Sequence, residues 1–282
     1  MKVFLGNVLS GPEPHVAADA GHPDPPPRKG FFTDTSVCIG CKACEVACKE
    51  WNQVPSKPLS LSGMSYDNTT QLGADSWRHV AFIEQDRPVD DPAGRTRWLM
   101  ASDVCKHCTH AACLDVCPTG ALVRTEFGTV VIQQDVCNGC GYCVSACPYG
   151  VIGQREDDGR MFKCTMCYDR LGAGLEPACA KACPTDSIQF GDLEELRERA
   201  AARVEQLHAD GDSGARLYGH DPEDGVGGDD AFFLLLDEPE AYGLPPDPVV
   251  TTRDLGSMWR HAGAAAAALA GLVAASFLGR RP

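Results

Sequence analysis

The residues of this 282-residue chain that could do chemistry are its sixteen cysteines, which fall into four groups of four with none left over. The groups are Cys38, Cys41, Cys44 and Cys48; Cys105, Cys108, Cys113 and Cys117; Cys137, Cys140, Cys143 and Cys147; and Cys164, Cys167, Cys179 and Cys183. A disulfide framework has no reason to produce groups of four, whereas a metal centre with four thiolate ligands has. The grouping therefore predicts tetrathiolate metal centres.

The third group has the most specific spacing. It reads Cys137-x2-Cys140-x2-Cys143-x3-Cys147 and is followed by Pro148, which is the run found in bacterial ferredoxins. The first three cysteines of such a run wrap a loop around one cubane 4Fe–4S cluster, and the fourth ligates a different cluster. Zinc sites commonly use two separated Cys-x2-Cys pairs instead. A zinc-stabilised scaffold without redox function is therefore the weaker alternative.

The second group predicts the partner of the third. It reads Cys105-x2-Cys108-x4-Cys113-x3-Cys117, with its first cysteine 32 residues before Cys137. This is the layout of a two-cluster ferredoxin, in which the two runs exchange their fourth cysteines. We expect cluster C to be held by Cys105, Cys108, Cys113 and Cys147, and cluster D by Cys137, Cys140, Cys143 and Cys117.

The first and fourth groups bracket this central pair, so they are expected to pair with each other. The first has the ferredoxin spacing, and the fourth carries a long insertion, with eleven residues between its second and third cysteines. We expect cluster A to be held by Cys38, Cys41, Cys44 and Cys183, and cluster B by Cys164, Cys167, Cys179 and Cys48. Because no ligand position is substituted, all four are predicted to be 4Fe–4S clusters.

The predicted fold class is α+β, with two nested ferredoxin-like dicluster units, a loop-rich chain and a C-terminal helix. Three similar segments (118–122, 148–152 and 184–188) follow fourth cysteines, and each is expected to turn into an apolar strand. The expected divisions are an irregular N-terminal arm (1–30), an outer dicluster unit (31–60 and 156–190), an insertion of modest structure (61–97), an inner dicluster unit (98–155), a C-terminal extension (191–256) and a transmembrane helix (257–282).

Local patterns predict the elements that support these loops. Residues 121–124 and 129–133 read as a β-hairpin. An N-cap at Gly191–Asp192 and apolar residues at helical spacing predict an amphipathic helix to Ala209. The Gly/Asp-rich segment 210–230 is expected to be a mobile loop. Residues 232–236 form either a short apolar strand or a buried helical turn.

The segment from Ala262 to Gly279 contains 18 residues without a charge. At ~1.5 Å per residue it covers about 27 Å, close to the ~30 Å hydrocarbon core of a bilayer. A single transmembrane helix is expected, with a soluble Ala-rich helix docking on a partner as the alternative. Basic residues lie at both ends, so the sequence leaves the orientation open.

Charge and motifs exclude several functions. The net charge of −14 argues against nucleic-acid binding, and lysines close to the cysteines are expected partly to offset the charge of the clusters. These lysines are Lys42, Lys49, Lys106, Lys163 and Lys181. We find no cleavable export signal, phosphate-binding loop, nucleophile elbow or pair of catalytic carboxylates. No catalytic residue is therefore predicted, and the chain is expected to have no substrate site of its own.

A few other residues could take part in the redox site. His107, inside the second group, is expected to donate or accept a hydrogen bond with sulfur or backbone, with iron ligation as the alternative. His261 is expected to be an interfacial anchor rather than a haem ligand. Residues 168–170 are expected to form a turn or a partner contact rather than a proton route.

The order and spacing of the four groups resemble those of the iron–sulfur (beta) subunits of molybdopterin oxidoreductase complexes. Three stretches are similar to formate dehydrogenase beta subunits in particular, and the resemblance covers about residues 30–255. They are Phe31 to Cys44 continuing to Glu50–Trp51–Asn52, then Lys163 to Arg170, and Tyr242 to Pro245.

This resemblance implies partner subunits and a direction of electron transfer. A catalytic alpha subunit with a molybdenum or tungsten pterin would oxidise formate and pass electrons to this chain. The outer pair of clusters would face the catalytic subunit, and the inner pair would lie nearer a membrane cytochrome b (gamma) subunit that delivers electrons to quinone. The same chain could instead serve a catalytic subunit for sulfur compounds, dimethyl sulfoxide, nitrate or hydrogen.

Overall fold

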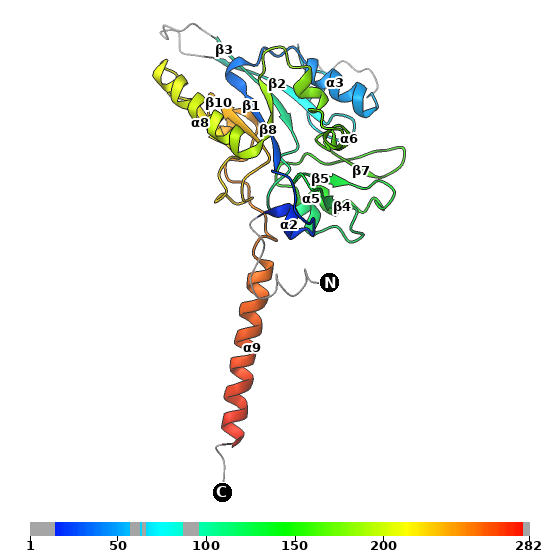
Figure 1. Ribbon diagram of the computed structural model, residues 1–282, viewed down its shortest axis with the longest axis vertical. Coiled ribbons are helices and arrows are strands. Elements are labelled where there is room, and N and C mark those ends of the chain that lie inside the picture. Colours follow the sequence, from blue (N-terminus) through cyan, green and yellow to red (C-terminus); the bar gives the residue numbers. More distant parts are fainter. Residues whose placement is uncertain (1–14, 57–62, 64–65, 87–95, 279–282) are drawn as a thin grey trace.

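The computed structural model describes residues 15–56, 63, 66–86 and 96–278. A body of short helices and strands carries one long helix, α9, which projects away from it (Figure 1). The helices are α2 (Val16–Asp19), η1 (Thr35–Val37), α3 (Ala43–Asn52), α4 (Ala112–Asp115), α5 (Tyr142–Ala146), α6 (Tyr168–Gly172), α7 (Ala178–Lys181), α8 (Leu193–Ala209), η2 (Pro239–Tyr242) and α9 (Leu255–Leu278). The strands are β1 (Lys29–Asp34), β2 (Arg78–Asp86), β3 (Thr96–Val104), β4 (Leu122–Arg124), β5 (Val130–Ile132), β6 (Gly153–Gln154), β7 (Met161–Phe162), β8 (Ile188–Asp192), β9 (Arg216–Tyr218) and β10 (Ala231–Leu235).

The largest sheet joins distant parts of the chain in the order β8-β1-β10-β9. Strand β1 pairs in parallel with β10, with Phe31 opposite Ala231, and antiparallel with β8, with Phe31 opposite Phe190. Strand β9 completes the sheet on the far side of β10. The outer segments 31–60 and 156–190 are therefore held together by a sheet that also includes the C-terminal extension.

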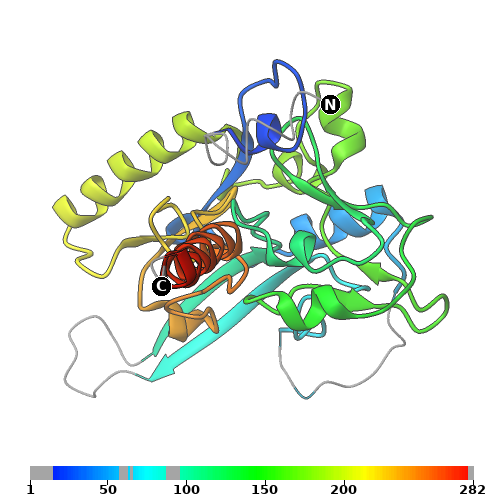
Figure 2. The same cartoon turned by 90° about the horizontal axis from the view of Figure 1, so that it is seen from below.

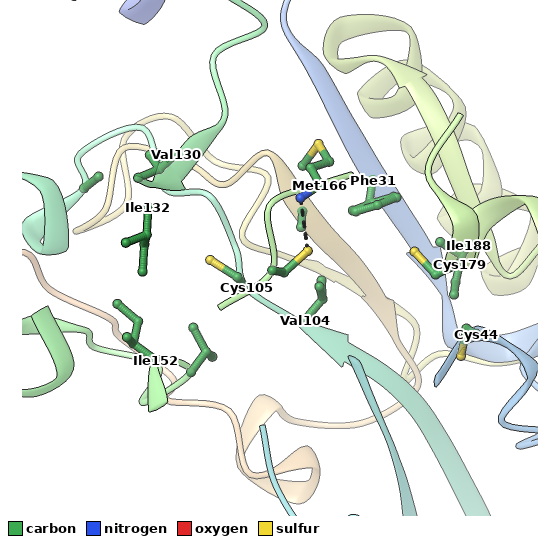
Figure 3. Close-up of a cluster of buried hydrophobic side chains, with 14 of the residues drawn as sticks. Phe31, Cys44, Val104, Cys105, Val130, Ile132, Ile152, Met166, Cys179 and Ile188 are labelled. Atoms are coloured by element: carbon green, nitrogen blue, oxygen red, sulfur yellow. Dashed lines mark hydrogen bonds between the residues drawn. The ribbon is translucent and has the colours of Figure 1, made fainter. Parts of the chain in front are cut away.

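The two faces of β1 pack into different cores, because successive side chains of a strand point to opposite sides. Phe32 stacks on Phe232 at 5.4 Å and packs with Leu193 and Leu196 of α8, which lies along that face of the sheet (Figure 1). Phe31 points to the other face, into a core that contains cysteines (Figure 3). The sheet therefore separates a purely apolar layer from the cysteine-bearing one.

Two local predictions are confirmed. The amphipathic helix is α8, which ends at Ala209 as expected. Asp192 is its N-cap residue, but the carboxylate pairs with Lys29 of β1 rather than with the helix. The predicted hairpin is β4 and β5, with Leu122 opposite Ile132.

The prediction of an insertion with modest structure over 61–97 is wrong where the structure describes that segment. Strands β2 and β3 form a long antiparallel hairpin, with Arg78 opposite Val104 and Asp86 opposite Thr96. The two strands were not predicted because each becomes regular only when it pairs with the other. The connecting residues 87–95, and residues 61, 62, 64 and 65, lie outside the described residues.

Two further expectations about irregular segments need correction. In the arm 1–30, of which residues 1–14 lie outside the described residues, α2 buries Ala17, and the ring of His22 makes a 2.8 Å hydrogen bond to the carbonyl of Arg124. The segment 210–230 contains β9 and ends in two fully buried carboxylates, Asp229 and Asp230, so it is an ordered part of the fold. The apolar segment that follows is a strand, β10.

Helix α9 begins seven residues before the expected uncharged stretch and has 24 residues, none of them buried. At ~1.5 Å per residue it is about 36 Å long. Its most apolar window has a mean hydropathy of 1.7, so it is long and apolar enough to cross a membrane. The helix projects away from the body in the side view (Figure 1), and in the view from below, close to its own axis, it lies in front of the body (Figure 2). Residues 279–282 of the predicted transmembrane segment lie outside the described residues.

Candidate iron–sulfur centres

The four cysteine loops share a backbone feature that their sequences only partly reveal. In the first Cys-x2-Cys pair of each group the second intervening residue has a positive φ: Gly40 (+65°), His107 (+50°), Gly139 (+74°) and Met166 (+55°). This left-handed conformation costs a side-chain-bearing residue roughly 1–2 kcal/mol, so glycine is the ordinary occupant. His107 and Met166 adopt it at the same place, which makes the four loops structural repeats.

A second repeat follows three of the fourth cysteines. Gly120, Gly150 and Asp186 each stand three residues after such a cysteine, and each has a positive φ between +52° and +67°. The chain then enters β4, the Val151–Ile152 segment before β6, or β8. The expected turn is therefore present in all three segments, and it leads directly into an apolar strand in the first and third, whereas in the second the apolar residues Val151 and Ile152 precede the short strand β6.

The structure brings cysteines from different groups together. Burial raises the pKa of the Cys48 thiol, and three thiolate neighbours from the fourth group raise it further. These neighbours are Cys164, Cys179 and Cys167. Cys48 therefore lies among the fourth group rather than with the rest of its own.

The same exchange is seen elsewhere. Burial raises the pKa of Cys38, with Cys183 and Cys41 as its thiolate neighbours. The neighbours of Cys108 are Cys105, Cys113 and Cys147. Burial raises the pKa of Cys143 to about 11, and its neighbours are Cys137, Cys117 and Cys140. These neighbourhoods agree with the expected quartets, whose assignment as ligand sets stays a prediction.

Two of the quartets line cavities. Cys105, Cys108, Cys113 and Cys147 surround one, together with His107 and Val130. Cys38, Cys41, Cys44 and Cys183 surround another, beside Ser102 and Ser187. Among the described residues, no three His, Cys, Asp or Glu side chains are arranged to hold one metal ion, as a tetrathiolate zinc at about 2.3 Å would require. Thiols spread around a hollow fit a multi-iron core better.

Most of these thiols are poor acids in the metal-free chain. Burial raises the pKa of Cys44 to about 11 and that of Cys113 to about 12, and it raises those of Cys48 and Cys164 further. The free thiols are therefore protonated near neutral pH. Because metal binding requires thiolates, binding of a cluster to these sites releases protons.

Thiols of neighbouring quartets come close enough to interact electrostatically at three points, and these points give the order of the quartets. Cys44 of the A set has Cys179 of the B set as a thiolate neighbour. Cys164 of the B set has Cys105 of the C set, and Cys113 of the C set has Cys143 of the D set. Figure 3 shows Cys44, Cys179 and Cys105 following one another through the core. The order along the molecule is A, B, C, D.

The two ends of this row reach the surface. Cys41 of the A set and Cys140 of the D set are the exposed cysteines. Large apolar side chains are exposed near each of them: Ile39 and Val46 near Cys41, and Val136, Tyr142 and Val144 near Cys140. Exposed apolar groups beside a functional end are typical of interaction surfaces.

Sulfurs of the outer quartets receive hydrogen bonds from side chains. Arg78 of β2 is fully buried and donates to the Sγ of Cys179 at 3.3 Å. Ser102 of β3 lies 3.2 Å from the Sγ of Cys44. The amide of Asn52 at the end of α3 donates to Cys48 and Cys167, at 3.7 and 3.6 Å.

In the inner quartets, the sulfurs of Cys117 and Cys147 accept mainly from backbone N–H groups, whereas Cys105 has a side-chain hydrogen bond with Lys163. Burial pushes the pKa of Cys117 up, but backbone donors and the hydroxyl of Thr119 outweigh it and leave the pKa below its ordinary value. The backbone donors are those of Leu122, Thr119 and Ala121. Cys147 similarly accepts from the backbone of Tyr149, Gly150 and Val151, although burial keeps its pKa raised.

Among the lysines expected to offset cluster charge, Lys163 meets the expectation most closely. It is fully buried, and although burial disfavours its charge, the thiolates of Cys105, Cys113 and Cys164 raise its pKa. The other four pair chiefly with carboxylates or carbonyls: Lys42 with Glu45 and Asp67, Lys49 with the carbonyls of Asp75 and Pro55, Lys106 with Asp103 and Lys181 with Glu176.

Arg78 is a functional candidate that sequence reasoning missed. It lies 27 residues before Cys105, its nearest cysteine in sequence, and only the pairing of β2 with β3 brings it to Cys179. The thiolates of Cys179, Cys44 and Cys164 raise its pKa in spite of burial. No local pattern marks it.

The side chains of residues 168–170 and of His261 make contacts that support the fold. The hydroxyl of Tyr168 donates to Glu126 at 3.0 Å, and Arg170 lies 4.2 Å from the ring centre of Trp51, so this segment forms turn and surface contacts. The ring of His261 makes a 2.9 Å hydrogen bond to the carbonyl of Ser257, one turn earlier in α9.

Two families of 4Fe–4S dicluster domain match this protein, one over residues 96–193 and the other over residues 37–121. The sequence is 42% identical over 233 residues to the iron–sulfur subunit of the nitrate-inducible formate dehydrogenase of Escherichia coli (strain K12), covering 81% of this protein and 76% of that one. It is 42% identical over 249 residues to the formate dehydrogenase iron–sulfur subunit of Haemophilus influenzae, covering 86% and 76%. It is also 38% identical over 170 residues to a subunit of the anaerobic dimethyl sulfoxide reductase of E. coli, covering 60% and 76%.

Proposed function

Because this chain belongs to the family of formate dehydrogenase iron–sulfur subunits, with four 4Fe–4S clusters and an electron-transfer role, we propose that it carries electrons from a formate-oxidising subunit to a membrane acceptor. The catalytic subunit holds a molybdenum or tungsten pterin, and the acceptor is a cytochrome b subunit that delivers to quinone. Oxidation of formate yields carbon dioxide, one proton and two electrons. The clusters supply the one-electron redox chemistry, and this chain's own residues hold, space and insulate them.

The observation that carries the proposal is the row of thiol quartets with an exposed cysteine at each end. Cys41 marks the end for the catalytic subunit and Cys140 the end for the acceptor. The start of α9 lies beside the inner unit, since Thr252 donates to Asp115 of α4 at 2.6 Å and Val250 packs on Ala112. These contacts support an arrangement in which the inner pair lies on the side of the proposed membrane anchor.

The proposal includes the four ligand sets. Cluster A takes Cys38, Cys41, Cys44 and Cys183; cluster B takes Cys164, Cys167, Cys179 and Cys48; cluster C takes Cys105, Cys108, Cys113 and Cys147; and cluster D takes Cys137, Cys140, Cys143 and Cys117. The neighbourhoods of Cys48, Cys38, Cys108 and Cys143 support this exchange. Cys48→Ser should damage cluster B and spare cluster A, as seen by EPR of the reduced protein. Loss of cluster A with cluster B intact would contradict the exchange.

The electron donor is tested on the whole complex. An affinity tag on this chain should isolate, under anaerobic conditions, a complex whose iron–sulfur subunit holds about 16 iron and 16 sulfide, four of each per cluster. Formate should reduce these clusters within the complex. If formate leaves them oxidised while dimethyl sulfoxide or a sulfur compound reoxidises them after chemical reduction, the chain serves the related class of complex instead, to which the dimethyl sulfoxide reductase relative points.

The membrane anchor is tested separately. The complex with residues 257–282 deleted should move from the membrane to the soluble fraction, because α9 is the one span candidate among the described residues. Its iron content should stay unchanged, since none of α9 packs into the body. Unaltered membrane association of the truncated complex would count against a spanning helix.

A further inference from the structure

His107 is a buried histidine inside a cysteine loop that none of the predicted ligand sets uses. It stands between Cys105 and Cys108, is 1% exposed, and adopts the left-handed backbone conformation with φ +50°. Its side chain helps to line the cavity that the four cysteines of the C set surround. A large polar ring in this conformation at full burial calls for a partner.

The hydrogen bonds of the ring fix which nitrogen carries the proton. The backbone N–H of Val130 in β5 donates to Nδ1 at 3.1 Å, so Nδ1 is the acceptor. Since an imidazole nitrogen that accepts a hydrogen bond carries no proton, the ring is neutral and its single proton is on Nε2.

The Nε2–H group is left without a partner among the described residues, although it is buried. An unsatisfied buried donor costs roughly 1–3 kcal/mol. Nδ1 faces Val130, and the ring borders the cavity of the C set, so the opposite edge of the ring is available to that cavity. The four thiols of the C set already supply one ligand for each iron of a cubane, which leaves donation to sulfur as the role for Nε2–H.

We propose that His107 is a tuning residue whose Nε2–H donates a hydrogen bond to a sulfur of cluster C. This rests on the ligand set proposed for cluster C. A donor to sulfur stabilises the more negative, reduced state, so it raises the reduction potential of that cluster. Lys163 acts in the same direction, because it is a buried cation among Cys105, Cys113 and Cys164 and donates to the carbonyl of Val130.

The effect is specific to one cluster of the row. The corresponding positions of the other three loops are Gly40, Gly139 and Met166, whose side chains have no hydrogen-bond donor. Cluster C lies between B and D, so the tuning acts at the passage from the outer to the inner unit. Met166 also shows that methionine is accommodated in this backbone conformation, which makes His107→Met a fair test variant.

The first experiment uses the tagged complex with ¹⁵N-labelled histidine. Pulsed EPR of the stepwise reduced complex should detect a histidine nitrogen coupled to a single cluster. The coupling should vanish in His107→Met and persist in His220→Gln, a control at a histidine on the loop after β9. If the wild-type complex has its full iron content but shows no histidine coupling, the inference about His107 is overturned. That result leaves the proposed function intact, because the proposed function is tested by iron content and by reduction with formate.

The second experiment measures reduction potentials of the same variants. At a fixed ambient potential, His107→Met should lower the ratio of reduced to oxidised cluster C by about 2- to 10-fold, the value of one hydrogen bond. His107→Gln, which keeps an N–H near the position of Nε2, should recover part of the loss. A His107→Met complex with four intact clusters and an unchanged ratio would also refute the role.

Discussion

The outer and inner cluster units are built on the same loop repeat but supply hydrogen bonds to sulfur from different sources. In the outer unit the donors include, beside backbone groups such as the N–H of Met166, the side chains of Arg78, Ser102 and Asn52, two of them from the β2–β3 hairpin. In the inner unit the donors are mainly backbone N–H groups that follow Cys117 and Cys147. A single substitution can therefore remove a donor from an outer sulfur, whereas Cys117 and Cys147 keep their backbone donors, and the contact proposed for His107 is a side-chain exception within the inner unit.

The largest difference between the units is expected at Arg78. Arg78→Met leaves the buried thiolates of Cys179 and Cys44 without their cation, and loss of one partner of a buried ion pair costs about 3–5 kcal/mol. We expect anaerobically purified protein to lose iron from clusters A and B while C and D are retained. Iron analysis with EPR measures this, and Lys181→Met, at a largely exposed cation paired with Glu176, is the matched control. Equal loss from all four clusters would mean that Arg78 serves the fold rather than the outer sulfurs.

A smaller effect is expected at Asn52, which bridges two sulfurs of one quartet. Asn52→Leu keeps the approximate volume and removes both contacts, which costs about 1–2 kcal/mol. Cluster B should be lost several-fold faster than in the wild-type protein when an iron chelator is added anaerobically, with clusters C and D unaffected. An unchanged rate of loss of cluster B would contradict the conclusion that side-chain donors stabilise the outer clusters.

The smallest effect is expected at Thr119 of the inner unit. Its hydroxyl lies 3.6 Å from the Sγ of Cys117, but three residues also donate through the backbone to that sulfur. Thr119→Val should therefore change the stability of cluster D by less than about 0.5 kcal/mol, and the chelator assay should give a rate close to that of the wild type. A loss as fast as that of Asn52→Leu would show that side chains matter equally in both units.

Sequence patterns of short range predicted much of this architecture. Cysteine spacing is a local property, because a loop of fixed length wraps one cluster, and it led to quartets that agree with the observed neighbourhoods. The helix α8 and the β4–β5 hairpin followed from periodicity and turn residues within a single segment. His107 was also identified as a candidate, from its place inside a cysteine loop.

What could not be predicted depends on pairing between distant segments. The parallel pairing of β1 with β10 joins residues 200 apart, as at Phe31 and Ala231, and no local pattern specifies such a partner. The β2–β3 hairpin joins strands that are neighbours in sequence, but it was missed as well, and Arg78 and Ser102 were missed with it. The buried aspartates at the end of the 210–230 segment look like ordinary loop residues until Arg28 pairs with Asp230 and Tyr149 donates to Asp229.

The parallel pairing of β1 with β10 also determines the order in which the two cluster units can fold during translation. Residues 98–155 of the inner unit are contiguous, so this part can fold while the remainder of the chain is still on the ribosome. The outer unit has to wait for β8 and then for β10 to leave the exit tunnel before β1 gains both neighbours. Maturation therefore proceeds from the centre of the chain outward, and the first cysteines to be synthesised are among the last to be enclosed.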